Sequence, residues 1–348
     1  MTAFLPSSTS FPVRFAARML ALSLAAAGVA PVASCGRGKN DDTTYRVAVI
    51  PKGTTHVFWR SIHAGALLGA KSVEAATGKK VEIRWQGPLS ESEREAQRQI
   101  LETFTGSGVD GIVFAPIDSH AMVAPVDAAM AAGKPVVIID SGLESDNYVS
   151  FVATDNYKGG ELAGARLGKL LGGEGKVLLL RYQEGSASTT KREQGFIDVV
   201  RRDYPAIELM PPDLEQYAGA TAGEAQDAAE TLLNTYTDIS GIFCPNESSC
   251  TGMIEALRQS GRAGKVKFVG FDANEKLVAA LENDEIHGLI LQSPVRMGKM
   301  GVETLIAALR GEAVEKRIDT GVYLVTKDNM SAPEFRELLR PDLSILEE

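Results

Sequence analysis

A set of polar and aromatic side chains in this 348-residue chain stands where a parallel α/β sheet would gather its binding chemistry. In such sheets ligands bind beyond the carboxyl ends of the strands, near the point where the strand order reverses. Carboxylates and amides can accept from and donate to several hydroxyl groups, and arginine adds a planar fork of donors. Aromatic faces suit the C–H faces of a sugar ring. The pattern predicts a site for a sugar or polyol, built from Asp140, Arg192, Asn246, Asp272 and Gln292 at or beyond expected strand ends, with Lys52, His56, Phe58 and Trp59 from the loop after the first strand.

Each of these residues also has a plain structural interpretation. Asp140 and Asp272 could cap the helices that follow them. The two adjacent aromatic residues could belong to the core, and Arg192 could be solvated on a helix face. Lys52 could be an exposed loop lysine, whereas inside a cleft its cation would favour a ligand that carries a carboxylate or another acceptor-rich group. One shared site explains the whole set, while the plain interpretations need several unrelated coincidences.

Short β-rich runs alternate with amphipathic helical patterns along the body of the chain, which predicts parallel sheets covered by helices on both faces. We expect the second helix to begin at Ser90, with Glu93 completing a capping box. The strands are expected at 46–50, 81–85, 111–115, 135–140, 150–153, 176–181, 207–210, 241–244, 267–271 and 288–292. The other helices are expected at 60–77 and at roughly 157–171, 190–203, 219–236, 248–260, 274–282 and 294–310.

An internal echo divides this series into two halves. The segment DGIVFAP at 110–116 is matched by SGIFCP at 240–245. Later in each half a strand that follows a glycine ends in aspartate, as GKPVVIID at 133–140 and GKVKFVGFD at 264–272. The order and nearly equal offset of the two matches predict two similar α/β domains, each a doubly wound, Rossmann-like parallel sheet.

The amino terminus has the layout of a secretory signal. Arg14 and Arg18 precede an apolar run from Met19 to Val32, which is too short to span a bilayer as a stable helix, and small residues precede Cys35. The sequence V-A-S-C resembles a bacterial lipoprotein cleavage box, in which the cysteine becomes the acylated first residue. We therefore expect a signal peptide over 1–34, a flexible linker over 35–43, and a location in the periplasm or on the outer face of the cell membrane. The alternative is a short buried helix with a free cysteine.

Composition limits the possible partners. The formal charge is −9, and loss of the two signal-peptide arginines makes it −11, which disfavours nucleic acid and anionic lipid surfaces. A membrane contact is therefore expected only through the lipid anchor. Cys244 and Cys250 could form a disulfide in an oxidising compartment or could be two small buried apolar side chains, and their spacing leaves both open.

Catalytic patterns are missing. The histidines His56, His63, His120 and His287 are scattered, neither H-E-x-x-H nor G-x-S-x-G occurs, and the S-x-x-K at 188–191 lacks its companion motifs. We expect no enzyme activity, no metal and no cofactor. A sugar-responsive transcription regulator would need a DNA-binding domain where this chain has a secretion signal.

From Arg46 to about Thr326 the chain resembles the ribose/galactose-type (type I) periplasmic binding proteins, the sugar-binding components of ABC importers. The resemblance rests on three ordered motifs, GFD at 270–272, ILQSP at 290–294 and SASTTKREQGF at 186–196. It implies a monomer that traps a sugar or sugar-like ligand between two domains by hinge closure and delivers it to the permease. The alternative is a receptor that presents its ligand to a membrane kinase or chemoreceptor.

The resemblance also assigns individual residues. It places Arg192 at the sugar-binding arginine, His56 where an asparagine is common, and Ser141 where ribose binders carry a second arginine. A third aromatic residue is expected near 215–221, and Tyr217 is the candidate. Lys52 replaces a small polar residue, which suggests a ligand other than ribose. The implied domains are 44–154 plus 293–321 and 155–292 plus 322–348.

Overall fold

The computed structural model describes residues 43–347. The expected signal peptide and Cys35 lie outside the described residues. Among the residues that are described, no helix combines the length and apolar character needed to cross a membrane.

The first sheet is wholly parallel. Its strands are β1 (Thr44–Ile50), β2 (Lys80–Trp85), β3 (Gly111–Phe114), β4 (Val136–Ile139), β5 (Ser150–Ala153) and β11 (Arg317–Asp319), in the order β11-β5-β4-β3-β1-β2. The strands β1, β3, β4 and β5 are buried along most of their length, as expected for apolar runs covered on both faces, whereas the edge strands β2 and β11 are partly exposed.

The second sheet repeats this arrangement. Its strands are β6 (Glu174–Leu179), β7 (Ala206–Met210), β8 (Gly241–Phe243), β9 (Lys267–Phe271), β10 (Gly288–Gln292) and β12 (Val322–Val325), in the order β12-β10-β9-β8-β6-β7. All pairs are parallel except β10 with β12. The order of β6–β10 is therefore the order of β1–β5, and the predicted fold of two doubly wound α/β domains is confirmed.

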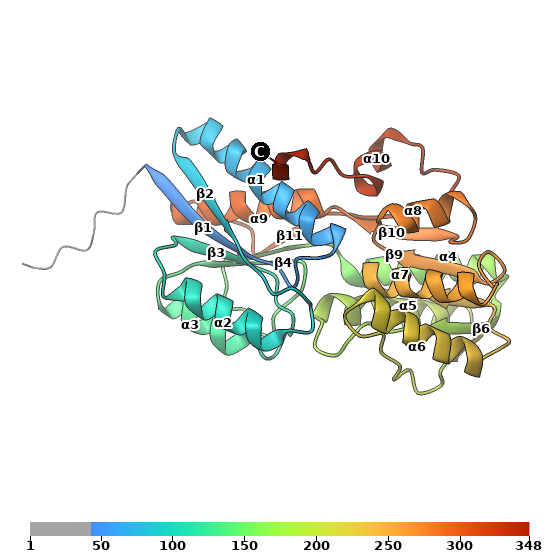
Figure 1. The fold of residues 1–348 in the computed structure, drawn as a ribbon. Coiled ribbons are helices and arrows are strands. Elements are labelled where there is room, and N and C mark those ends of the chain that lie inside the picture. Colours follow the sequence, from blue (N-terminus) through green and yellow to red (C-terminus); the bar gives the residue numbers. More distant parts are fainter. Residues whose placement is uncertain (1–42, 348) are drawn as a thin grey trace, which may run out of the picture. The chain divides into compact units, whose positions relative to one another are not determined.

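Helices cover both faces of each sheet (Figure 1). On the first sheet, α1 (Val57–Thr77) and α9 (Pro294–Leu309) cover one face, and α2 (Arg94–Thr105) and α3 (Val123–Ala131) cover the other. On the second sheet, α4 (Asn156–Leu170) and α5 (Ala187–Asp203) cover one face, and α6 (Ala222–Thr235), α7 (Glu247–Gln259) and α8 (Glu275–Glu282) cover the other. The terminal α10 (Pro333–Leu339) packs on the second sheet, and the short 3₁₀ helix η1 (Ser344–Glu347) lies against α1.

Two local expectations need correction or completion. The second helix begins at Arg94, not at Ser90, because the Glu93 carboxylate accepts hydrogen bonds from the Leu89 and Ser90 amides and closes a turn ahead of the helix. Cys244 and Cys250 are free, buried thiols. Their sulfurs belong to the core beneath α7, and the Cys250 thiol donates to the Cys244 carbonyl.

Candidate ligand-binding site

A small cavity of about 20 Å³ lies between the carboxyl ends of the two sheets. Its lining contains the predicted residues Lys52, His56, Phe58, Trp59, Asp140, Arg192, Asn246, Asp272 and Gln292, together with Glu91, Tyr182, Ser188, Thr189 and Glu247. A cavity of this volume holds about one water molecule. The structure thus brings most of the predicted set together in a nearly closed cleft.

Arg192 lies between two aspartates that come from equivalent positions of the two sheets. Asp140 follows β4, and Asp272 follows its counterpart β9. Both have a left-handed backbone, with φ of 61° and 67°, a conformation that costs energy in a residue with a side chain and concentrates at functional sites. One Arg192 nitrogen lies 4.0 Å from an Asp140 oxygen and another lies 4.0 Å from an Asp272 oxygen.

The Arg192 side chain is held in place on several sides. Nε donates to Asn156 Oδ1 at 2.8 Å, Nη1 donates to the Pro245 carbonyl at 2.9 Å, and the guanidinium covers the Phe271 ring at 3.9 Å. Gly160 lets α4 pack closely against the backbone of α5 at Arg192, since a Cβ at position 160 would lie 1.9 Å from the Arg192 carbonyl oxygen. Nη2 is buried without a hydrogen-bond partner, so this donor is available to a ligand.

Lys52 is buried, with 2 % of its surface exposed, so its interpretation as a solvated loop lysine is wrong. Its ammonium lies 3.1 Å from Asp140 Oδ2 and donates to the hydroxyls of Ser186 at 3.3 Å and Ser188 at 3.1 Å. The serines flank the start of α5 in the second half of the fold, so Lys52 joins the two halves across the cleft.

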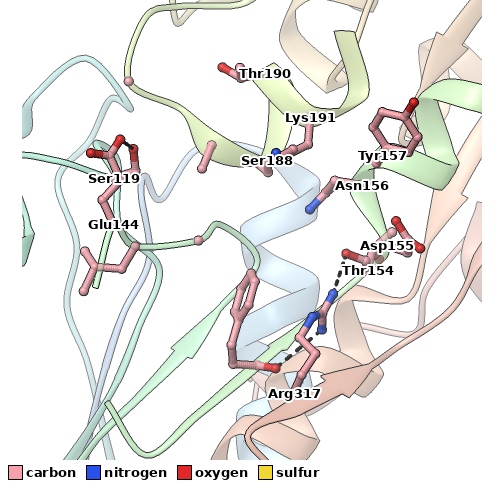
Figure 2. Close-up of a pocket in the computed structure, with 15 residues that line it drawn as sticks. Ser119, Glu144, Thr154, Asp155, Asn156, Tyr157, Ser188, Thr190, Lys191 and Arg317 are labelled. Carbon is pink, nitrogen blue, oxygen red and sulfur yellow. Dashed lines mark hydrogen bonds between the residues drawn. The ribbon is translucent and has the colours of Figure 1, made fainter. Parts of the chain in front are cut away.

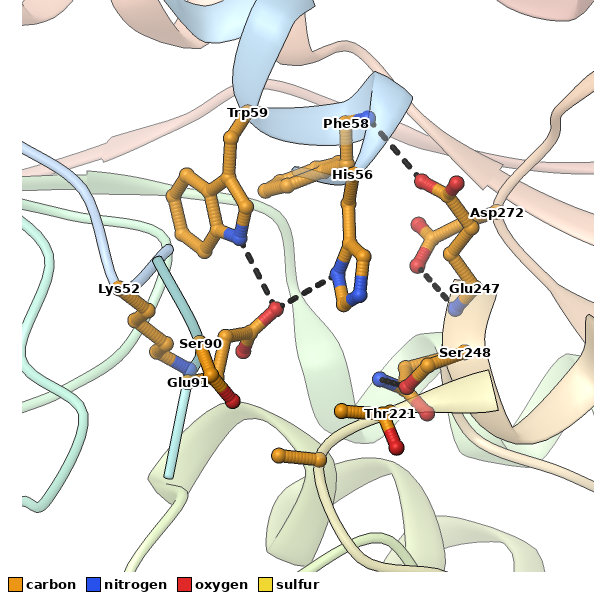
Figure 3. Close-up of polar contacts among 12 residues, drawn as sticks. Lys52, His56, Phe58, Trp59, Ser90, Glu91, Thr221, Glu247, Ser248 and Asp272 are labelled. Carbon is orange, nitrogen blue, oxygen red and sulfur yellow. Dashed lines mark hydrogen bonds and ion pairs between the residues drawn. The ribbon is translucent and has the colours of Figure 1, made fainter. Parts of the chain in front are cut away.

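Glu91 ties His56 and Trp59 together in the first half of the fold (Figure 3). One carboxylate oxygen lies 2.8 Å from His56 Nδ1 and accepts from Trp59 Nε1 at 2.9 Å. Burial lowers the pKa of His56, but the hydrogen bond and negative charge of Glu91, helped by the charges of Glu247 and Asp272, outweigh burial and raise it from 6.5 to about 9. Burial raises the pKa of Glu91, yet the His56 hydrogen bond and charge bring it down to about 2. At neutral pH the two side chains therefore form a buried ion pair.

We expect Glu91→Gln to lower the free energy of unfolding of the ligand-free protein by roughly 2–3 kcal/mol at pH 6. The raised pKa of His56 contributes stability that is complete below pH 6.5 and is lost as the pH rises through 9. The lowered pKa of Glu91 contributes stability above pH 4.5 that is lost towards pH 2. The difference between wild type and variant, measured by urea unfolding, should therefore shrink between pH 6.5 and 9. A difference that stays constant over this range would show that the ion pair does not form.

Asp272 is an acceptor at the other side of the cleft. Its oxygens accept from Gln292 Nε2 at 2.8 Å and from the Glu247 amide at 3.0 Å. Burial raises the pKa of Asp272 to about 6, and Arg192 offsets only part of this effect. The Oε1 of Gln292 is buried without a partner, which leaves a second acceptor for a ligand donor.

The remaining predicted residues have mixed roles. Phe58 and Trp59 serve both the core and the cleft, as an edge-to-face pair with ring centroids 4.8 Å apart. The Asn246 side chain caps α7 by accepting from the Ser249 amide while it lines the cavity.

The structure does not bring Ser141 and Tyr217 into the lining of this cavity. The Ser141 hydroxyl is buried and accepts from the Ser188 amide at 3.1 Å. The Tyr217 ring packs under the Arg181 guanidinium at 4.8 Å. The aromatic residue that the second half does supply to the cavity is Tyr182, whose hydroxyl is buried without a hydrogen-bond partner.

Sequence reasoning missed Glu91, Tyr182 and Glu247. Tyr182 comes shortly after β6. The counterpart of β6 in the first half is β1, which is followed by the predicted residue Lys52, so the echo between the halves could have pointed to Tyr182. Glu247 directly follows Asn246 and could have been included as its neighbour. Glu91 lies in a loop between β2 and α2 that carries no pattern pointing to the cleft.

A larger cavity of about 730 Å³ lies beside the site and shares Ser188 with it (Figure 2). Its wall contains Arg317, which donates to the carbonyls of Ala153 and Thr154, and Glu144, which accepts from Ser119. None of the residues predicted from the sequence to bind a ligand lines it. The smaller cavity is therefore the candidate site. Within residues 43–347 no group of histidine, cysteine or carboxylate side chains is arranged to hold a metal ion.

Residues 47–313 match the periplasmic binding protein domain family. The chain belongs to this family. The protein is 30% identical to the ribose import binding protein of Bacillus subtilis over 68% of its own length and 75% of the relative. The fold is also shared with two solved structures. One is a carbohydrate transporter solute-binding protein from Agrobacterium radiobacter in complex with D-arabinose, at 32% identity and a TM-score of 0.80, with 86% of this chain and 100% of that one covered. The other is an ABC transporter solute-binding protein from Agrobacterium vitis with bound D-fucose, at 35% identity and a TM-score of 0.79, with 84% and 99% covered.

These similarities confirm the resemblance to the type I periplasmic binding proteins predicted from the sequence motifs. Family membership also implies an extracytoplasmic location for the folded body. The relatives named above are solute-binding proteins rather than enzymes, in agreement with the missing catalytic motifs.

Proposed function

We propose that this periplasmic binding protein traps a neutral sugar between its two α/β domains by hinge closure and delivers it to an ABC transporter permease. The observation that carries the proposal is the position of Arg192 between Asp140 and Asp272. Two acceptors from opposite domains and a donor between them can hydrogen-bond the hydroxyls of one small ring from both sides. The named relatives, which bind ribose, D-arabinose or D-fucose, support the ligand class.

The charge balance of the cleft favours a neutral ligand over a sugar acid. Lys52 is paired with Asp140 at 3.1 Å, and His56 is paired with Glu91 at 2.8 Å. Arg192 lies within 4.0 Å of both aspartates. Each of these cations already has a carboxylate within 4.0 Å, and the free donor Arg192 Nη2 can bind a neutral hydroxyl. A sugar acid would add a further negative charge beside Asp140 and Asp272, and like charges at close range cost several kcal/mol.

The size of the cavity supports a hinge motion. About 20 Å³ holds roughly one water molecule, and both domains contribute to the wall. A monosaccharide can enter only if the domains separate, and a ligand favours closure only by contacting both of them.

We propose that the domains comprise residues 44–154 plus 293–321 and residues 155–292 plus 322–348. The proposal is supported by sheet membership, because the chain leaves the first sheet after β5, returns to it through α9 and changes sheets again between β11 and β12. The contact of η1 with α1 adds a further link between the halves at the carboxyl terminus. Each half is built on one sheet, and both halves of one chain line the cavity, so a monomer supplies the whole site.

A thermal-shift screen of the detergent-solubilised full-length protein tests the ligand class. We expect stabilisation by one or more neutral monosaccharides among D-arabinose, D-fucose, D-ribose and D-allose, because a ligand that binds the native state raises stability by mass action. Matched sugar acids, such as D-galacturonate, should give a much smaller shift. Stabilisation by sugar acids alone would overturn the neutral-ligand proposal, and uptake of the labelled sugar by cells with and without this protein tests delivery.

We further propose that the mature protein is tethered through acylated Cys35, a residue outside the described part of the chain. Cys35→Ala is expected to abolish palmitate labelling and to release the protein from the membrane fraction or leave it unprocessed. A diacyl tether with an N-acyl chain exceeds the single chain that gives only marginal binding. A Cys35→Ala protein that still incorporates labelled palmitate and sediments with membranes would refute the anchor.

A further inference from the structure

The helix α1 begins without a cap from its own segment. The N-cap residue His56 makes no side-chain hydrogen bond to the helix, because its imidazole is engaged by Glu91, and the first turn contains no acidic residue. The first amides of a helix have no partners within the helix, and they carry a partial positive charge. The start of α1 therefore needs an acceptor from elsewhere.

That acceptor comes from the opposite domain. The Glu247 carboxylate accepts from the Val57 amide at 3.3 Å and from the Phe58 amide at 3.0 Å, as Figure 3 shows for Phe58. Glu247 is the first residue of α7 and is 6 % exposed. Its carboxylate also accepts from Asn274 at 3.2 Å, and its amide donates to Asp272 at 3.0 Å.

We propose that Glu247 is a positioning residue for ligand capture, which caps α1 from the opposite domain and sets the fraction of molecules that are closed. The proposal rests on the hinge closure proposed above. The two capping bonds join different domains, so they exist only when the domains are together, whereas the amides of α1 are solvated when the domains separate. The observed affinity for any ligand is the intrinsic affinity multiplied by the closed fraction. Glu247 should therefore act on all ligands alike.

Two backbone amides far from Glu247 in the sequence report the same closure through their hydrogen bonds. The Ser119 amide donates to the Gly185 carbonyl at 2.9 Å, and the Ser188 amide donates to the Ser141 hydroxyl at 3.1 Å. Both bonds also join the first domain to the second. If Glu247 only capped α1 locally, these two amides would not respond to its replacement.

The test is hydrogen exchange followed by mass spectrometry on the detergent-solubilised full-length protein, without added sugar. We expect Glu247→Ala to speed exchange about five- to thirtyfold in the peptides containing Val57–Phe58, Ser119 and Ser188. Calorimetry should show weaker binding by a similar factor for each sugar that binds the wild type, with the order of preference unchanged. The exchange rates and affinities of Glu247→Gln should fall between those of the wild type and Glu247→Ala. A graded response in this more conservative variant guards against a folding defect in Glu247→Ala. Glu275→Gln is the matched control, because Glu275 is likewise the first residue of its helix but is exposed.

Unchanged exchange at Ser119 and Ser188 in Glu247→Ala would overturn the proposal. Losses of affinity that differ widely between sugars would also overturn it, because they would indicate that Glu247 contacts the ligand directly. Failure of the hinge closure itself has a different signature. In that case a saturating sugar would give the wild type no added protection at Ser119 and Ser188.

Discussion

Replacement of Arg192 by alanine should weaken sugar binding by more than a hundredfold and lower the free energy of unfolding by about 3–5 kcal/mol. The side chain is 2 % exposed and lies between the carboxylates of Asp140 and Asp272. Its removal leaves Asp272 as a buried charge without a nearby cation and removes the donor Nη2 that faces no protein partner. The variant loses the bonds to Asn156 and Pro245 as well.

Two further variants show which part of Arg192 matters. Arg192→Lys keeps the charge but cannot reproduce the fork of donors, so we expect it to recover part of the stability and little of the affinity. Arg201→Ala, on an exposed position of the same helix α5, is the control and should leave both quantities close to wild type. Calorimetry with the sugar identified by thermal shift measures the affinity, and urea unfolding measures the stability. Binding by Arg192→Ala within about threefold of wild type would mean that the ligand lies elsewhere.

The second large effect is expected at the two aspartates. Asp272→Ala and Asp140→Ala should each weaken sugar binding from about tenfold to more than a hundredfold, because each removes a charge-assisted hydrogen bond in a water-poor cleft. Because the two residues occupy equivalent strand ends of opposite domains, we expect losses of similar size. Affinity within twofold of wild type for both variants would place the site elsewhere.

Asp272 also predicts a pH dependence. Its folded-state pKa of about 6 exceeds the ordinary value of 3.8, so the carboxylate is the major form in the empty cleft at pH 7 but becomes protonated as the pH falls through 6. As an acceptor for sugar hydroxyls it must be ionised, and the affinity should fall as the pH is lowered through 6. For stability the sign is opposite, because a raised carboxyl pKa contributes stability that is complete below pH 3.8 and is lost as the pH rises through 6.

Asp272→Asn separates this effect from other titrations. Calorimetry on the variant should show weak binding that varies little between pH 5 and 7, whereas the wild type loses affinity over the same range. In the ligand-free protein, the stability of wild type relative to Asp272→Asn should increase as the pH falls from 7 to 4. A wild-type affinity that is constant between pH 5 and 7 would contradict the assignment of Asp272 as the ionised acceptor.

The sheets were predictable because their signals are local. The core strands β3, β4, β8 and β9 are apolar apart from Lys267 at the start of β9, and the sequence placed them to within one or two residues. The strands β11 and β12 were not predicted, since each is short and half-exposed and pairs only at a sheet edge. A helix after 110–116 was expected from the internal echo, but its bounds were not, because the apolar residues of α3 do not gather on one face and only Val126 and Ala129 are buried.

For the site, the sequence by itself determined which residues stand at the strand ends, because a strand followed by Asp140 or Asp272 is visible in the local pattern and its echo. Only the tertiary structure decided how these groups are paired. Lys52 meets Ser186 and Ser188 in the other half, Glu91 reaches His56 from a loop, and Glu247 reaches the start of α1 from 189 residues away. Such contacts depend on how two sheets face each other, and no periodicity along the chain encodes the distance between two loops. Tyr217 and Tyr182 illustrate the difference, since both are aromatic residues near the same edge of the second sheet, and packing alone put Tyr182 in the cleft and Tyr217 against Arg181.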